Sequence, residues 1–141
     1  MIDPLAALDR LGGANRGDVW TWRLVWFLRA MAAVSMLKGL YHWSAIIGIG
    51  DGPGTAFEAS PLAWQAATMF FAVIDLVAAV GLWLAAAWGG VLWLTAAISM
   101  AAVELFFPQV FGGRIVVALA EFAAILAYVG LTLMAARERP P

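Results

Sequence analysis

The chain has 141 residues, of which 65% are hydrophobic and 12% charged, whereas a soluble domain averages about 45–50% and about 25%. This composition is typical of a membrane protein whose main partner is the lipid bilayer. The formal net charge of -1 argues against a nucleic-acid partner, which needs a basic surface. Because the sequence has no cysteine, disulfides, thiol chemistry and cysteine-ligated metals are excluded.

Residues 1–19 precede the first long apolar run and form a separate N-terminal segment. The stretch "MIDPLAALDRLGGANRGD" has three acids and no short apolar core followed by a cleavage site, so we expect it to be retained. Asp3 and Pro4 suit a helix start, and Leu5, Leu8 and Leu11 share one stripe. This pattern fits a short helix at the membrane surface, and it fits a frayed tail equally well.

Residues 20–141 form the predicted transmembrane domain. A hydrocarbon core about 30 Å thick needs about 20 apolar residues per helix, and four runs meet this requirement, at about 24–48, 63–87, 90–107 and 114–136. The breaks between them are "GIGDGPGTAFEASP", "WGG" and "FPQVFGGR". The sequence therefore predicts an all-α, polytopic membrane protein with four transmembrane helices in a bundle.

The cations predict the orientation of this bundle. Arg10, Arg16 and Arg23 precede the first span and Arg137 and Arg139 follow the last, whereas Arg114 alone lies on the opposite side. We therefore expect both termini in the cytoplasm. The aromatic residues then fall into two belts, an inner one of Trp20, Trp22, Trp26, Trp83, Trp88 and Trp93 and an outer one of Trp43, Trp64, Phe106 and Phe107.

Five ionisable residues from the four spans share one slab of the membrane: Lys38, His42, Asp75, Glu104 and Glu121. A helical rise of about 1.5 Å per residue puts Lys38 and Asp75 near the midplane and the other three within about 10 Å of it on the outer side. Each charge left in lipid would cost about 2.5–3.5 kcal/mol, so we expect all five to face the bundle interior as one buried polar cluster.

Two roles for this cluster remain open. A Lys–Asp pair can fix the register of the helices, because removing one partner leaves an uncompensated buried charge. Alternatively, three carboxyls facing Lys38 and one titratable histidine make the cluster over-acidic, and a carboxyl becomes a candidate proton acceptor. Lys38, His42 and Asp75 are then the candidate binding residues for a cofactor, of which a quinone is one possibility.

The sequence lacks the residues that several common cofactor-binding and ligand-binding sites require. A haem held by two histidines within one chain is excluded, because His42 is the sole histidine. The Glu-x-x-His repeats of di-iron bundles are absent, so no metal is expected. The stretch "GIGDGPG" lacks the lysine of a phosphate-binding loop. No catalytic residue can be assigned, and the balance is against an enzyme.

Two segments, "FLRAMAAVSMLKGLYHWSAIIG" at 27–48 and "FAVIDLVAAVGLWLAAAWGGVLWL" at 71–94, resemble an uncharacterised family of four-helix inner-membrane proteins of proteobacteria. The shared features are Lys38-Gly39, His42-Trp43, Asp75 and the hairpin "GLWL…WGGVLWL". This resemblance covers most of the chain and implies a multi-pass protein of the bacterial inner membrane, with no assigned activity. A more distant similarity, carried by "LRA…KGLYH", is to DoxX-type membrane proteins and implies a quinone-linked redox role.

The small size, the short loops and the lack of an extramembrane domain favour a non-enzymatic accessory or assembly subunit of a larger inner-membrane complex. Its protein partners would be other membrane subunits or further copies of the chain. One alternative is a DoxX-like redox component, in which Lys38 or His42 hydrogen-bonds a quinone carbonyl and Asp75 or a glutamate exchanges the proton. A second alternative is a small proton-coupled transporter that acts as a dimer.

Overall fold

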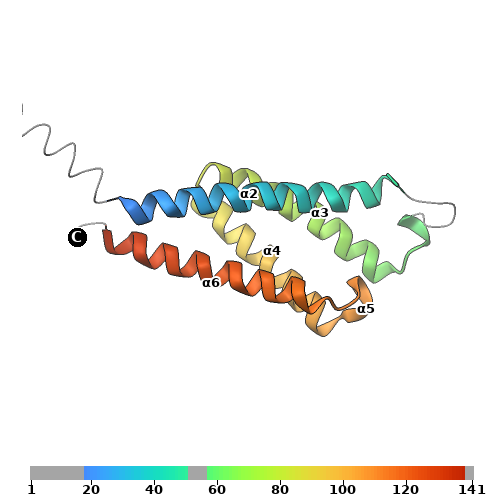
Figure 1. Cartoon of the computed structure of the whole chain (residues 1–141). Helices are drawn as coiled ribbons and strands as arrows, with labels where there is room; N and C mark the ends of the chain where they lie inside the picture. Colours follow the sequence, from blue (N-terminus) through green and yellow to red (C-terminus); the bar gives the residue numbers. More distant parts are fainter. Residues whose placement is uncertain (1–17, 51–56, 139–141) are drawn as a thin grey trace, which may run out of the picture.

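The computed structural model describes residues 18–50 and 57–138. The predicted surface helix at the N-terminus lies outside these residues. Four long helices carry the fold (Figure 1): α2 (Val19–Ile46), α3 (Leu62–Trp83), α4 (Ala87–Phe106) and α6 (Ile115–Glu138). Two short helices, η1 (Phe57–Ala59) and α5 (Pro108–Phe111), lie in the connections.

All four long helices are long and apolar enough to cross a membrane. Their outward surfaces carry large exposed hydrophobic side chains, such as Leu37, Val116 and Leu126, which suit lipid as solvent. No strand occurs in the described parts of the chain. The predicted all-α fold with four transmembrane helices is therefore confirmed, and the protein is a multi-pass membrane protein.

The long helices are arranged around the bundle in chain order. α2 packs on α3, α3 on α4 and α4 on α6, and α6 returns to pack on α2. The start of α2 and the end of α6 consequently lie at the same end of the bundle, at the left of Figure 1, while α5 lies at the opposite end.

The turn between α3 and α4 lies earlier in the chain than the apolar runs suggest, at residues 84–86 and not at the expected break "WGG". The expected second span extends to residue 87, whereas α3 ends at Trp83 and α4 begins at Ala87. In the turn, Ala85 has a φ of 50°, and its N–H donates to Leu82 O while Ala86 N–H donates to Gly81 O. These two bonds satisfy carbonyls at the end of α3, which hydropathy alone cannot indicate.

Two glycines bring α3 and α4 into backbone contact beside this turn. A Cβ atom on Gly89 would collide with the backbone of Gly81, and one on Gly81 would collide with that of Gly89. Small residues allow membrane helices to approach closely. The hairpin is therefore closed by this pair of glycines.

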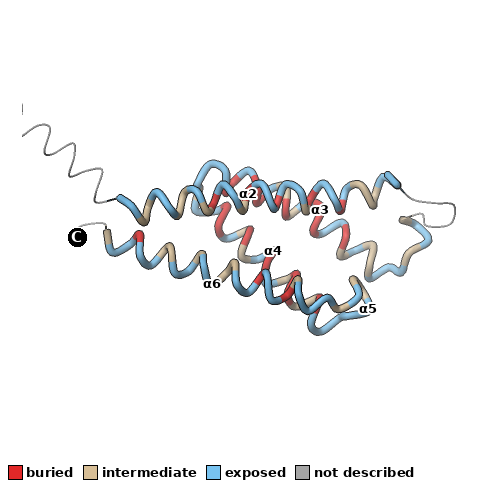
Figure 2. Tube along the Cα trace, in the orientation of Figure 1, coloured by how far each residue is buried: buried red, intermediate tan, exposed pale blue. Residues whose placement is uncertain are grey.

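Most of the buried residues lie on α3 and α4 (Figure 2). The majority of the buried apolar residues are alanines. The central cluster of the hydrophobic core contains Leu28, Ala32, Ala78, Leu82, Trp93 and Ala97. Trp93 is only 2% exposed and packs edge-on against Phe27 and Tyr128, with ring centroids 6.2 Å and 5.5 Å apart. Its expected place in an interfacial belt is wrong, because its ring fills the space between α2, α4 and α6.

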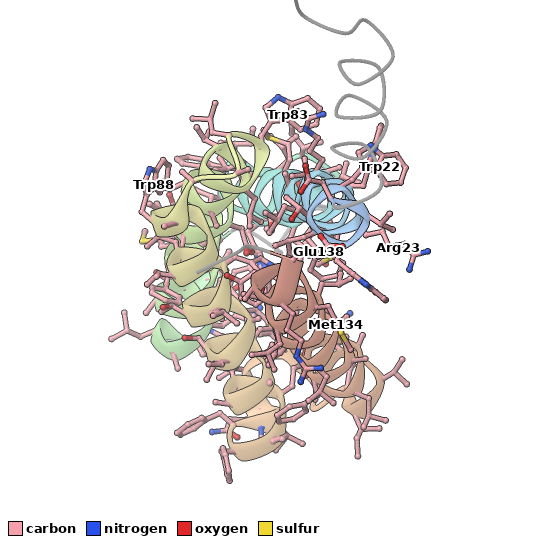
Figure 3. The ribbon with its side chains drawn as sticks, turned by 90° about the vertical axis from the view of Figure 1, so that its left-hand side faces the viewer. Trp22, Arg23, Trp83, Trp88, Met134 and Glu138 are labelled. Carbon is pink, nitrogen blue, oxygen red and sulfur yellow. The ribbon has the colours of Figure 1, made fainter. Side chains whose placement is uncertain are left out.

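Other tryptophans do surround the end of the bundle that holds the start of α2. Figure 3 looks onto this end and shows Trp22, Trp83 and Trp88 directed outward from α2, α3 and α4. All three side chains are exposed. This arrangement suits indole rings at a membrane–water interface.

A carboxylate from the last turn of α6 caps the first turn of α2. The Glu138 carboxylate accepts hydrogen bonds from Trp20 N–H, at 2.9 Å to Oε1, and from Thr21 N–H, at 3.1 Å to Oε2. The side chain of Asp18, at the N-cap position, makes no such bond. Because the first N–H groups of a helix lack partners within it, the Glu138 carboxylate satisfies two of them and links the end of α6 to the start of α2 (Figure 3).

Candidate functional site

Lys38 of α2 lies between two carboxylates from two other helices. Its Nζ donates a hydrogen bond of 2.6 Å to Oε1 of Glu121 on α6, and it lies 3.9 Å from Oδ1 of Asp75 on α3. Glu121 is 8% exposed and Asp75 is fully buried. The three residues, here called the lysine triad, connect α2, α3 and α6.

The close approach of α2 to α3 depends on Gly39. A Cβ atom at this position would lie 2.7 Å from the Cγ of Leu76, the residue after Asp75. Trp43, one turn further along α2, donates its indole N–H to the carbonyl oxygen of Ala72 at 3.1 Å. The Lys-Gly and His-Trp pairs therefore place α2 close to the surface of α3 that carries Asp75.

Asp75 has less polar support than its neighbours. Neither carboxylate oxygen has a hydrogen-bond partner, and the hydroxyl of Thr68, two turns earlier on the same face of α3, also has none. A buried polar group without a partner costs roughly 1–3 kcal/mol, and a charged group costs more. Lys38 offers Asp75 Coulombic attraction without a hydrogen bond, so this carboxyl is the most poorly satisfied group of the triad.

Glu104 does not join the lysine triad. Its Oε2 accepts the Arg114 backbone N–H at 2.7 Å, and its Oε1 lies 3.5 Å from the Arg114 guanidinium Nη2. Glu104 is 3% exposed, and Arg114 directly precedes α6. A buried carboxylate of α4 thus holds the start of α6 by a backbone hydrogen bond and an ion pair.

His42 lies among aromatic rings and not beside a carboxylate. Its imidazole stacks on Phe71, with centroids 5.7 Å apart, and is tilted against Phe111 at the same distance. It also borders a cavity of about 260 Å³ whose wall includes Tyr41, Trp64 and Arg114. The histidine is therefore part of an aromatic pocket near α5.

The five expected polar residues are all buried or half-buried, but they form three separate environments. Lys38, Asp75 and Glu121 come together, Glu104 pairs with Arg114, and His42 lies beside the aromatic cavity. Within residues 18–50 and 57–138, no group of three His, Asp or Glu side chains is arranged to hold a metal ion.

Sequence reasoning missed the roles of Arg114 and Glu138. Arg114 is the only cation between positions 39 and 136 of the sequence, and this isolation was a usable signal that a buried acid would pair with it. Glu138 follows the last apolar residues, and nothing in its spacing indicates that it reaches the start of α2.

These observations define an all-α, multi-pass membrane protein with a buried ion-paired site between its helices. The chain belongs to DUF6163, a family of unknown function, whose sequence profile matches residues 22–139. The expected membership of an uncharacterised family is confirmed. No curated protein and no solved structure matches the chain.

Proposed function

We propose that this protein is a non-enzymatic accessory or assembly subunit of a larger complex in the bacterial inner membrane, with both termini in the cytoplasm. The observation that carries this proposal is the outward face of α6. Four small residues follow one another there at helical spacing: Ala120, Ala123, Ala127 and Gly130. We call them the α6 small-residue face.

This face is open in the isolated chain. All four residues are exposed, and a Cβ atom built on Gly130 would meet nothing within 4 Å. Helix α6 is also the least buried of the four long helices. In its most apolar stretch of 18 residues, 11% of the residues are buried, compared with 50% in α3. Small residues are enriched where membrane helices contact each other, because they let the backbones approach. A transmembrane helix of another subunit is therefore the occupant that we propose.

The lysine triad fits this role as a structural device. It joins α6 to α2 and α3 by the Lys38–Glu121 hydrogen bond and the contact with Asp75. Glu138 and Glu104 hold the two ends of α6 by further backbone hydrogen bonds. The proposed docking helix is thus held at both ends and at Glu121, about two turns from its start, which favours a single orientation of the small-residue face.

To test this proposal, the tagged chain is extracted from its own membrane with a mild membrane-solubilising polymer and studied by native mass spectrometry. We expect one second polypeptide at a constant ratio with the wild type and with Val91→Phe, a matched change at an exposed site on α4. Ala127→Phe should lose that polypeptide while its helical content stays the same. A chain that is always alone or only self-associated, at every expression level, would contradict the proposal.

A quinone-linked redox role is the second candidate, and the cavity beside His42 favours it. A cavity of about 260 Å³ with Tyr41, Trp64 and Phe111 in its wall suits a planar ring, and Arg114 or His42 would supply a hydrogen-bond donor to a carbonyl oxygen. Purified protein from quinone-containing membranes should then carry quinone, and His42→Ala should reduce the amount. Absence of quinone from the wild type, together with unchanged respiration in His42→Ala cells, would exclude this role.

A further inference from the structure

An apolar groove runs between α2 and α3 on the half of the bundle that contains the start of α2. Its volume is about 430 Å³, and it is lined by Ala32, Ala33 and Met36 of α2 and by Ala79, Val80 and Trp83 of α3. Three of the lining residues, Ala32, Ala33 and Ala79, have small side chains that leave this space unfilled. The groove is separate from the lysine triad and lies on other helices than the α6 small-residue face.

Arg29 lies beside this groove, against the ring of Trp83, which forms part of the groove wall. It lies one turn before Ala32 and Ala33 on α2, it is exposed, and its guanidinium carbon is 5.7 Å from the centroid of the Trp83 ring. Among the described residues no carboxylate lies within ion-pair distance of Arg29, whereas Lys38 and Arg114 both have one. A cation without an acidic partner, held against an aromatic ring, is left free for an anion.

The groove extends from Arg29 toward the middle of the membrane. Met36 is seven positions after Arg29, which corresponds to about 10 Å along the helix, while half of the hydrocarbon core is about 15 Å thick. With Met36 at the midplane, the Arg29 backbone would lie about 5 Å inside the hydrocarbon edge, and its long side chain can reach the headgroup level. The apolar floor of the groove would lie at the depth of acyl chains. Trp83, at the end of α3, stands at the interface end of the same groove.

We propose that this groove binds one anionic glycerophospholipid from the leaflet on the side of the chain ends. The lipid phosphate pairs with the Arg29 guanidinium, and an acyl chain lies over Ala33 and Ala79. Charge complementarity selects this occupant, because a cation near the membrane surface attracts anionic headgroups and the rest of the groove offers only apolar contacts. A helix from a second copy would bury Arg29 without supplying an anion.

The experiment reconstitutes the whole chain in nanodiscs of equal parts phosphatidylglycerol and phosphatidylethanolamine. The protein is then transferred to detergent, and native mass spectrometry measures the lipids that stay bound. We expect the wild type to retain one lipid, with phosphatidylglycerol preferred. Arg29→Gln should lower this preference roughly five-fold, equivalent to about 1 kcal/mol for one arginine near the surface, and Arg29→Lys should restore much of it. Arg23→Gln is the matched control, since Arg23 lies on the same helix against Trp20 and outside the groove.

A second variant separates the groove from the charge. Ala33 is exposed, so Ala33→Phe fills the groove without changing the buried core, and retention of both lipids should fall. Three results would overturn the proposal: equal preference for phosphatidylglycerol in the wild type and Arg29→Gln, an undiminished lipid adduct on Ala33→Phe, or a dimer of the chain in place of the lipid adduct. Circular dichroism of each variant establishes that the fold is retained.

Discussion

Lys38 has two acidic neighbours, and the structure distinguishes them by geometry. Glu121 accepts its hydrogen bond at 2.6 Å, whereas Asp75 lies at 3.9 Å without one. A charged hydrogen bond contributes more than a longer ion contact. Glu121 is therefore the principal partner of Lys38, and Asp75 depends on Lys38 more than Lys38 depends on Asp75.

This geometry predicts that loss of Lys38 destabilises the protein and that neutralising Glu121 as well recovers part of the lost stability. Lys38→Met should lower the free energy of unfolding by about 3–5 kcal/mol, because it leaves buried carboxylates without a cation. Adding Glu121→Gln to Lys38→Met should recover part of this loss by removing one of those carboxylates. Unfolding in mixed micelles measures these values, and Leu37→Met, at a neighbouring exposed position, is the control, with an expected change within about 0.5 kcal/mol. Recovery no greater than that produced by Leu37→Met in the Lys38→Met background would contradict the assignment.

The sequence predicted the membership of the lysine triad better than that of the wider cluster. Helical rise determines the depth of Lys38, Asp75 and Glu121, and the high cost of lipid exposure indicates that they face inward. Depth alone could not separate Glu104 from them. The pairing of Glu104 depends on the turn after α5, where Gly112 and Gly113 have positive φ values and return the chain so that Arg114 reaches Glu104.

At the scale of the helices, the α3–α4 hairpin depends on the absence of two side chains. Gly81 and Gly89 touch through their backbones, so any Cβ atom there must separate the helices. Hydropathy located both helices because each run is apolar along its length. It misplaced their facing ends, since the apolar residues continue through a turn whose geometry comes from Ala85 and its two hydrogen bonds.

Replacing one of these glycines should therefore destabilise the hairpin. Gly89→Ala should lower the free energy of unfolding by about 1–3 kcal/mol, as overpacking generally does. Gly130→Ala is the matched control, because a Cβ atom there meets nothing and the better helix propensity of alanine should add up to about 1 kcal/mol. Thermal unfolding in one detergent compares the two variants, and equal effects would show that the close approach does not matter.

A second prediction at the scale of the helices concerns the Glu138 carboxylate that caps the first turn of α2. Glu138 accepts hydrogen bonds from Trp20 and Thr21, so Glu138→Gln should weaken them by removing the negative charge at the helix N-terminus. We expect faster hydrogen exchange at both amides and unchanged exchange at the middle of α2. Arg137→Gln, one residue away, should leave the exchange of Trp20 and Thr21 as it is. Equal protection in Glu138→Gln and the wild type would argue against this cap.

At the scale of the whole molecule, the four helices contribute differently to the core and to the charged contacts. α3 and α4 supply most of the small-residue core. All four helices contribute to the charged contacts, because Asp75 lies on α3 and Glu104 on α4, while Lys38 lies on α2 and Glu121 and Glu138 on α6. We assign occupants to two of the open surfaces: a lipid to the groove between α2 and α3, and a protein helix to the α6 small-residue face. Neither surface could be predicted from hydropathy, because it depends on which alanines remain uncovered after packing.

The most direct test of the accessory role is photo-crosslinking in the native membrane. A benzophenone amino acid replaces Ala123 on the α6 small-residue face or, as the control, Val91 on the exposed surface of α4. We expect position 123 to capture one defined membrane polypeptide other than the chain itself, and position 91 to capture none. Capture of lipid alone, or of a second copy of the chain alone, at position 123 would contradict the accessory role.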